Sequence, residues 1–207
     1  MSIMISKEEL KILNVFRKNL FKEYSISDIM KLIKKNSYSW VFNSVKKLTS
    51  LDLISFSEKA GIKMYFLNFE NPLVFRYLGI CDYENISTLP MKNISKLINS
   101  VPSSYFTLLV GGSYAKGKNI KNSDLDILVI VENKLDVKKV LAILENESSL
   151  MVPKVDLHVF SKKEFLEMLL DNEENLGKQF FENSFVLFGV ESYYFLIKEA
   201  KKNGFRS

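Results

Sequence analysis

The stretch YFTLLVGGSYAKGKNIKNSDLDILVIV, residues 105–131, decides the fold of the C-terminal half of this chain. It begins with an apolar run typical of a buried strand, passes through a turn with two glycines and a serine, and ends in a second apolar run that opens with two aspartates. Glycine at positions 111 and 112 lets backbone amides approach anionic oxygens, and Ser113 adds a hydroxyl near an expected helix N-terminus. The turn is therefore suited to holding a triphosphate.

The two aspartates that open the second strand are expected to lie together. Side chains alternate along a strand, so Asp124 and Asp126 project to one face while Leu125 and Ile127 enter the core. Two carboxylates this close repel each other unless a cation joins them, and hard oxygen ligands of this kind suit Mg²⁺. The Gly-x4-Gly-Lys-Ser/Thr spacing of a Walker A loop is absent.

The run Gly112-Ser113-x-Ala115-x-Gly117, followed by Ser123-Asp124-x-Asp126, resembles the minimal nucleotidyltransferases of the DNA polymerase beta superfamily. The resemblance covers about residues 104–190, including the run NSFVLFG at 183–189, which is similar to the family's terminal strand. It implies an α/β domain with a mixed sheet, two Mg²⁺ ions held by Asp124 and Asp126, and ATP or another nucleoside triphosphate as substrate. The residues expected to bind the nucleotide are Gly111, Gly112, Ser113, Lys116 and Ser123.

The same resemblance requires a third carboxylate on a neighbouring strand, reached after a helix. Residues 136–144 are expected to form the helix, and KVDLHVF at 154–160 the strand, with Asp156 as the third metal ligand and catalytic base. Glu132 is a weaker alternative because it lies at the far end of its strand. His158 shares a face with Asp156; a hydrogen-bonded structural role is favoured, and contact with substrate is the alternative.

Apolar spacing in the N-terminal third predicts three helices. The first covers Lys7 to Leu20 after Ser6, the second is short and capped by Ser27, and the third runs from Ser39 to Thr49. Two strand-like runs, 53–57 and 63–69, then predict a β-hairpin. Three helices followed by a hairpin resemble the winged helix-turn-helix of prokaryotic transcription regulators over about residues 5–70.

Positive charge is concentrated in this same third. Residues 1–70 carry 12 Lys and Arg against 7 Asp and Glu, whereas residues 71–207 carry 17 of each. The winged-helix resemblance implies binding of double-stranded DNA, with the third helix in the major groove and the hairpin near phosphates. A protein-docking module and an ordinary solvated surface are the alternatives, and Tyr38 and Trp40 are expected in the core unless they stack on a base or partner. The residues expected to contact DNA are Ser39, Asn43, Lys46, Lys47, Lys59 and Lys63.

The whole chain is therefore expected to be an α+β protein. Its predicted divisions are a winged helix at 1–71, a helical connector at 72–103 and a nucleotidyltransferase domain at 104–207. Cys81 is the single cysteine and His158 the single histidine, which excludes an internal disulfide and structural zinc. No apolar run approaches the roughly 20 residues of a membrane span and no signal peptide is recognised, so a cytoplasmic protein without membrane contact is expected.

The resemblance implies transfer of a nucleoside monophosphate, AMP from ATP, to a protein or small-molecule acceptor. Minimal members of the family often act as antitoxins, which favours a protein acceptor such as a cognate toxin. The alternative is a transcription regulator, expected to be a homodimer, whose nucleotidyltransferase fold senses a nucleotide. A catalytically dead scaffold is disfavoured because the costly acidic pair is intact.

Overall fold

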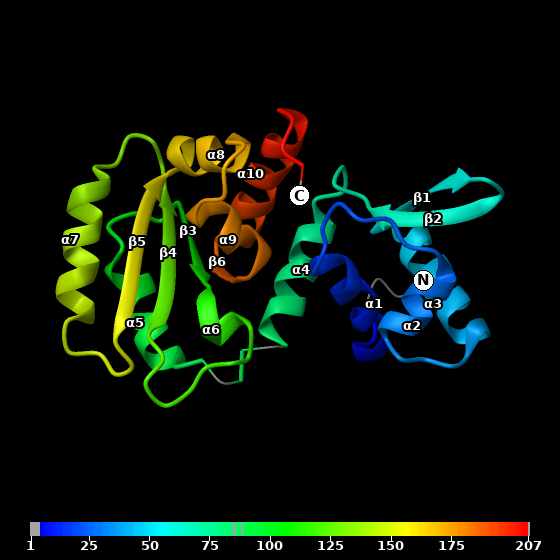
Figure 1. Ribbon diagram of the computed structural model, residues 1–207, viewed down its shortest axis with the longest axis horizontal. Coiled ribbons are helices and arrows are strands. Elements are labelled where there is room, and N and C mark those ends of the chain that lie inside the picture. The colour runs from blue at the N-terminus through cyan, green and yellow to red at the C-terminus, as the bar shows by residue number, and fades with distance from the viewer. Residues whose placement is uncertain (1–4, 85, 88, 207) are drawn as a thin grey trace. The chain divides into compact units, whose positions relative to one another are not determined.

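A computed structural model describes residues 5–84, 86–87 and 89–206. The chain forms two compact units, one ending at Cys81 and the other running from Asp82 to Arg206. Helix α4 (Leu73–Tyr83) lies mostly in the first unit and α5 (Met91–Ser100) in the second, so the two helices expected in a connector are divided between the units (Figure 1). The three-part division drawn from the sequence stays a prediction.

The first unit has the predicted order of three helices and a hairpin. Its elements are α1 (Lys7–Arg17), α2 (Ile26–Leu32), α3 (Tyr38–Ser50), β1 (Ile54–Lys59) and β2 (Ile62–Leu67). The strands are antiparallel and are joined by Ala60 and Gly61, both with positive φ, the backbone that a two-residue hairpin turn of the mirror-image type requires. The apolar stripes of the helices form the core of this unit, with Ile12, Phe16, Ile29, Val41, Val45 and Leu48 fully or almost fully buried.

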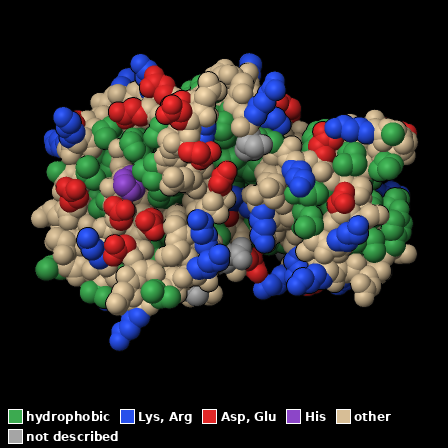
Figure 2. Space-filling view, in the orientation of Figure 1, with side chains coloured by type: hydrophobic (Ala, Val, Ile, Leu, Met, Phe, Trp, Pro, Cys, Tyr) green, Lys and Arg blue, Asp and Glu red, His purple; other side chains and the backbone are tan. Residues whose placement is uncertain are grey.

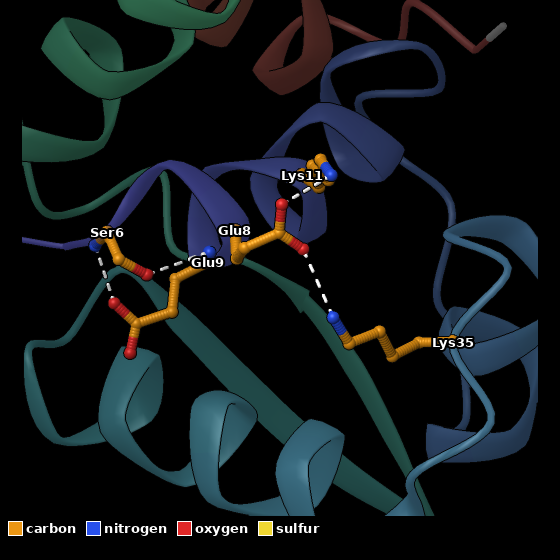
Figure 3. Close-up of polar contacts among 5 residues, drawn as sticks. All are labelled: Ser6, Glu8, Glu9, Lys11 and Lys35. Atoms are coloured by element: carbon orange, nitrogen blue, oxygen red, sulfur yellow. Dashed lines mark hydrogen bonds and ion pairs between the residues drawn. The ribbon is translucent and has the colours of Figure 1, made fainter.

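Capping residues determine where the first two helices begin. Ser6 and Glu9 cap α1 reciprocally: each side chain accepts a hydrogen bond from the other residue's backbone amide (Figure 3). The sequence placed the second cap at Ser27, which was wrong. Ser25 caps α2, because the acid that completes a capping box, Asp28, stands three residues after Ser25.

The second unit is built around a mixed four-stranded sheet in the order β5-β4-β3-β6. Strands β4 and β5 are parallel and the other pairs are antiparallel, so the predicted mixed sheet is confirmed. Helices α5 and α7 pack together on one face, while α8 and α10 contact the other (Figure 1). The elements after α5 are β3 (Phe106–Val110), α6 (Gly112–Ala115), β4 (Leu125–Val131), α7 (Val137–Ser148), β5 (Val155–Ser161), α8 (Lys162–Leu170), α9 (Leu176–Glu182), β6 (Phe185–Phe188) and α10 (Val190–Lys202).

The alternation along β4 sets the two faces of this sheet apart. Leu125 and Ile127 are completely buried in the core beneath α5 and α7, as predicted, and so is Val129. Asp126 therefore points to the opposite face, the one that α8 and α10 contact. No helix among the described residues combines the length and the apolar character needed to cross a membrane.

Candidate active site

Strand register brings two of the predicted aspartates side by side. In the parallel pair of β4 and β5, Asp126 is the register partner of Asp156. Neighbouring strands lie about 4.8 Å apart, and partners in register project from the same face. Asp124 directly precedes β4, two residues before Asp126. The structure thus gathers the three carboxylates that the sequence singled out at the end of the sheet where β4 and β5 begin.

The pKa of Asp126 shows that the negative charge of the three aspartates is not compensated. Its pKa is raised above the ordinary value, first by burial and next by the charge of Asp156, with a smaller contribution from Asp124. Hydrogen bonding to its own backbone and the proximity of His158 lower its pKa and offset only part of this effect. A carboxylate in this position is stabilised by any bound cation.

The glycine turn packs directly against this carboxylate. Gly112 has a φ of +59°, which favours glycine, and a Cβ at this position would overlap the Asp126 carboxylate. The backbone of residue 112 therefore approaches Asp126 only because no side chain intervenes. This contact explains physically why glycine stands at position 112.

Gly111 has a different role from the one predicted. Its amide donates a hydrogen bond to the carbonyl of Asp126 at 2.9 Å, so this amide is not available to a phosphate. A Cβ at Gly111 would lie 2.7 Å from the ring of Phe180 on α9. Gly111 therefore fixes the turn to the sheet, and its predicted contact with the nucleotide stays a prediction.

Other predicted nucleotide-binding groups remain accessible around the turn. Amides at the start of a helix have no intrahelical acceptor, and Gly112 and Ser113 occupy the first two positions of α6. Lys116 is exposed just after this helix. The hydroxyl of Ser123, by contrast, accepts the amide hydrogen of Ile120 at 2.9 Å and closes the loop that leads to β4.

His158 lies next to the acidic group, at the surface beside acidic side chains (Figure 2). Its Nε2 atom is 3.4 Å from Oδ2 of Asp156, longer than an ordinary N–H···O hydrogen bond. Its ring meets that of Phe180 edge-on, with the centroids 6.4 Å apart. Glu132, the weaker alternative for the third carboxylate, is exposed beyond the end of β4, as expected.

Within residues 5–84, 86–87 and 89–206, no group of three or more His, Cys, Asp or Glu side chains is arranged to enclose a metal ion. The chemistry of the donor set nevertheless fits a hard divalent cation, because Asp124 and Asp156 both raise the pKa of Asp126 and all three present oxygen. These residues are thus suited to a cation that is shared with water and phosphate oxygens.

Comparison with known families gives one match. Residues 94–187 match the family model described as a nucleotidyltransferase domain. The second unit therefore carries a segment similar to a nucleotidyltransferase. The matched nucleotidyltransferase segment runs from α5 to β6 and includes all three aspartates, the glycine turn and His158. Neither the search of curated proteins nor that of solved structures produced a match.

The residues predicted to contact DNA lie outside the matched segment and fall into two groups. Ser39, Asn43 and Lys46 are all exposed on α3. The other three already have partners: Lys47 forms an ion pair with Glu9 at 2.9 Å, Lys59 one with Glu23 at 2.9 Å, and Lys63 lies 4.4 Å from the ring centroid of Phe56.

Two exposed aromatic side chains of α3 were missed or misplaced by the sequence interpretation. Tyr38 is 55% exposed and Phe42 is 42% exposed, and their rings stack with centroids 6.1 Å apart. Tyr38 is therefore not a core residue, contrary to the expectation. The four-residue spacing of the two rings, which places them on one helix face, was the signal available in the sequence.

Proposed function

We propose that the second unit is a Mg²⁺-dependent nucleotidyltransferase that moves a nucleoside monophosphate, AMP from ATP, to a protein or small-molecule acceptor. The observation that carries this proposal is the alignment of Asp126 with Asp156 across β4 and β5, directly against the Gly112 turn. Carboxylates beside a glycine-serine turn would combine the two requirements of nucleotidyl transfer, a cation site and a triphosphate site.

In this proposal Asp124, Asp126 and Asp156 hold the metal, with two ions expected. When bound, Mg²⁺ would neutralise charge on the triphosphate and lower the pKa of the attacking hydroxyl. The raised pKa of Asp126, which burial and then the neighbouring carboxylates cause, supports the need for this positive charge.

The chain's own groups would position the reactants and accept the proton. The amides of Gly112 and Ser113, the Ser113 hydroxyl and Lys116 would bind the β and γ phosphates. The acceptor oxygen forms a bond to the α-phosphorus as the bond from that phosphorus to the bridging oxygen breaks, and pyrophosphate leaves. Asp156, 54% exposed at its side chain, is accessible enough to take the hydroxyl proton.

The resemblance to minimal nucleotidyltransferases supports a protein acceptor such as a cognate toxin, so that the chain would act like an antitoxin. This acceptor would be modified on a hydroxyl group, because the proposed chemistry places a proton-accepting carboxylate beside the attacking atom.

A second candidate function is suggested by the exposed face of α3. Ser39, Asn43 and Lys46 are accessible together there, which supports a winged helix that binds double-stranded DNA, as a homodimeric regulator would. The nucleotidyltransferase fold would then sense nucleotide. The two functions are compatible in one protein that represses transcription and modifies a partner.

Transfer is tested with α-³²P-labelled ATP, CTP, GTP or UTP, Mg²⁺ and a lysate of the source cells as acceptor pool. The wild-type protein is expected to label a discrete species, and the double variant Asp124→Asn, Asp126→Asn to lose at least about a thousandfold of this activity. Nucleotide binding without transfer by the wild-type protein would contradict the enzyme and favour the regulator, with operator footprinting as the next measurement.

A further inference from the structure

His158 is an imidazole placed beside the acidic group without an ordinary hydrogen bond to it. Its side chain is 30% exposed and its Nε2 atom faces Oδ2 of Asp156 at 3.4 Å. Hydrogen bonds between nitrogen and oxygen are usually 2.7–3.2 Å long. The pair is therefore close enough to interact with a common atom but too far apart for a good direct bond.

The separation matches that of two donors on one cation. Bonds from first-row divalent metals to nitrogen or oxygen are about 2.0–2.2 Å long, so adjacent donors in octahedral or tetrahedral geometry lie about 3.0–3.4 Å apart. Asp156 and His158 are two residues apart on β5 and project to the same face, the spacing at which a strand presents two ligands together.

Apolar neighbours of His158 hold its ring in place. Its register partner on β4 is Leu128, which is completely buried and apolar. Its ring meets Phe180, a buried residue that also packs against Gly111. The imidazole is thus fixed by β5 and α9, with its polar contact directed toward Asp156.

We propose that His158 and Asp156 coordinate the same divalent cation, so that one metal position of this site has a mixed nitrogen and oxygen donor set. Mg²⁺ binds oxygen and gains little from imidazole, whereas Mn²⁺ and later first-row ions accept both. This one metal position therefore prefers Mn²⁺ to Mg²⁺. Water or phosphate supplies the remaining positions. This inference rests on the metal-dependent site of the proposed function.

The experiment uses the full chain without a histidine tag, Mn²⁺ alone and no nucleotide. Because His158 is the single histidine, pulsed electron paramagnetic resonance of bound Mn²⁺ reports an imidazole nitrogen from one residue only. We expect a nitrogen coupling in the wild-type protein that changes from ¹⁴N to ¹⁵N when the protein is made with ¹⁵N-histidine. This isotope comparison needs no substitution and so does not depend on a variant's folding.

Two variants and a control then test metal preference. His158→Gln is expected to abolish the nitrogen coupling and to weaken Mn²⁺ binding about tenfold, with Mg²⁺ binding, measured by competition, changed less than about twofold. Asp156→Asn is expected to weaken binding of both ions. Glu167→Gln removes a carboxylate on α8, in a groove that Phe160, Glu164, Met168 and Asp171 also line, and should change neither ion's binding.

Absence of nitrogen coupling in the wild-type protein, or equal loss of Mn²⁺ and Mg²⁺ binding in His158→Gln, would overturn the proposal. These outcomes are separable from those of the transfer assay because no nucleotide is present. Nitrogen coupling without nucleotidyl transfer would support His158 as a metal ligand and contradict the proposed enzyme. Transfer without nitrogen coupling would support the enzyme and contradict His158 as a ligand.

Discussion

The two units treat their charges in opposite ways. In the first unit, lysines that appear in the sequence as excess positive charge are paired: Lys11 and Lys35 both contact Glu8 (Figure 3), and Lys47 contacts Glu9. Hydrogen bonds from Lys11 and then Lys35 lower the pKa of Glu8. In the second unit, burial and then Asp156 raise the pKa of Asp126.

This difference shows that net charge and functional charge are separate quantities. The first unit has the charge excess by count, yet several of its lysines lie in ion pairs with Glu8, Glu9 or Glu23, each worth little at an exposed surface. Residues 71–207, which include the second unit, carry equal numbers of positive and negative residues, yet like charges are concentrated where β4 and β5 begin. A candidate site is therefore marked by a local imbalance of charge and not by the net charge of the unit that contains it.

The largest expected effect comes from the close approach of the glycine turn to the carboxylate of Asp126. Gly112→Ala places a methyl group on the Asp126 carboxylate and also strains a positive φ, so we expect nucleotidyl transfer to fall at least about a hundredfold. Stability should fall by roughly 1–2 kcal/mol. Both are measured by the labelled-nucleotide assay and by thermal unfolding.

Gly117→Ala is the matched control for this substitution. Gly117 has a φ of +62°, close to that of Gly112, but no atom lies within 4 Å of a Cβ placed there. It should lose roughly 1 kcal/mol of stability through backbone strain and keep most of its activity. Equal loss of transfer in both variants would contradict a special contact between Gly112 and Asp126.

A smaller effect tests the uncompensated charge itself. Because the pKa of Asp126 is raised by burial and then by Asp156, the folded state holds its proton more tightly than the unfolded state. Stability should therefore fall as pH rises from about the ordinary value of 3.8 through the raised pKa, and the loss should persist at neutral pH. Asp126→Asn should unfold a few degrees higher than wild type at pH 7 without divalent ions, and the gap should vanish near pH 3.

Divalent ions provide the second arm of this test. Mg²⁺ should raise the unfolding temperature of the wild-type protein more than that of Asp126→Asn, which lacks the charge that the ion neutralises. Either of two results would contradict this prediction: a lower unfolding temperature for Asp126→Asn at pH 7, or an equal response of both proteins to Mg²⁺. Each would show that the charge of Asp126 beside Asp156 does not destabilise the folded protein.

The smallest expected effects compare neighbouring lysines on α3. Lys46→Ala should leave stability unchanged and reduce the salt dependence of double-stranded DNA binding by about one phosphate contact, a slope change of roughly 0.9. Lys47→Ala removes the contact with Glu9 and should instead cost roughly 0.2–1 kcal/mol of stability with little effect on DNA. Fluorescence anisotropy across salt concentrations and thermal unfolding measure the two effects, and identical behaviour of the variants would refute the distinction.

Much of the secondary structure of the second unit could be predicted from local sequence patterns. The apolar runs predicted β3 and β4, Asp136 caps the expected helix as α7, and β6 lies within the run expected to resemble a terminal strand. Helix α10 was not predicted. It begins after Gly189, whose positive φ and close approach to the carbonyl of Phe106 only the folded sheet reveals.

The sequence by itself determined the glycine-serine turn, the pair of aspartates two residues apart and the alternation that separates core from site, because these depend on neighbours along one strand. Only the tertiary structure decided that Asp156 stands beside Asp126, that Gly112 lies on a carboxylate while the Gly111 amide is committed to the sheet, and which lysines already have partners. Strand register and ion pairing join residues distant in sequence, and a shift of one residue in register would turn Asp156 to the other face of the sheet.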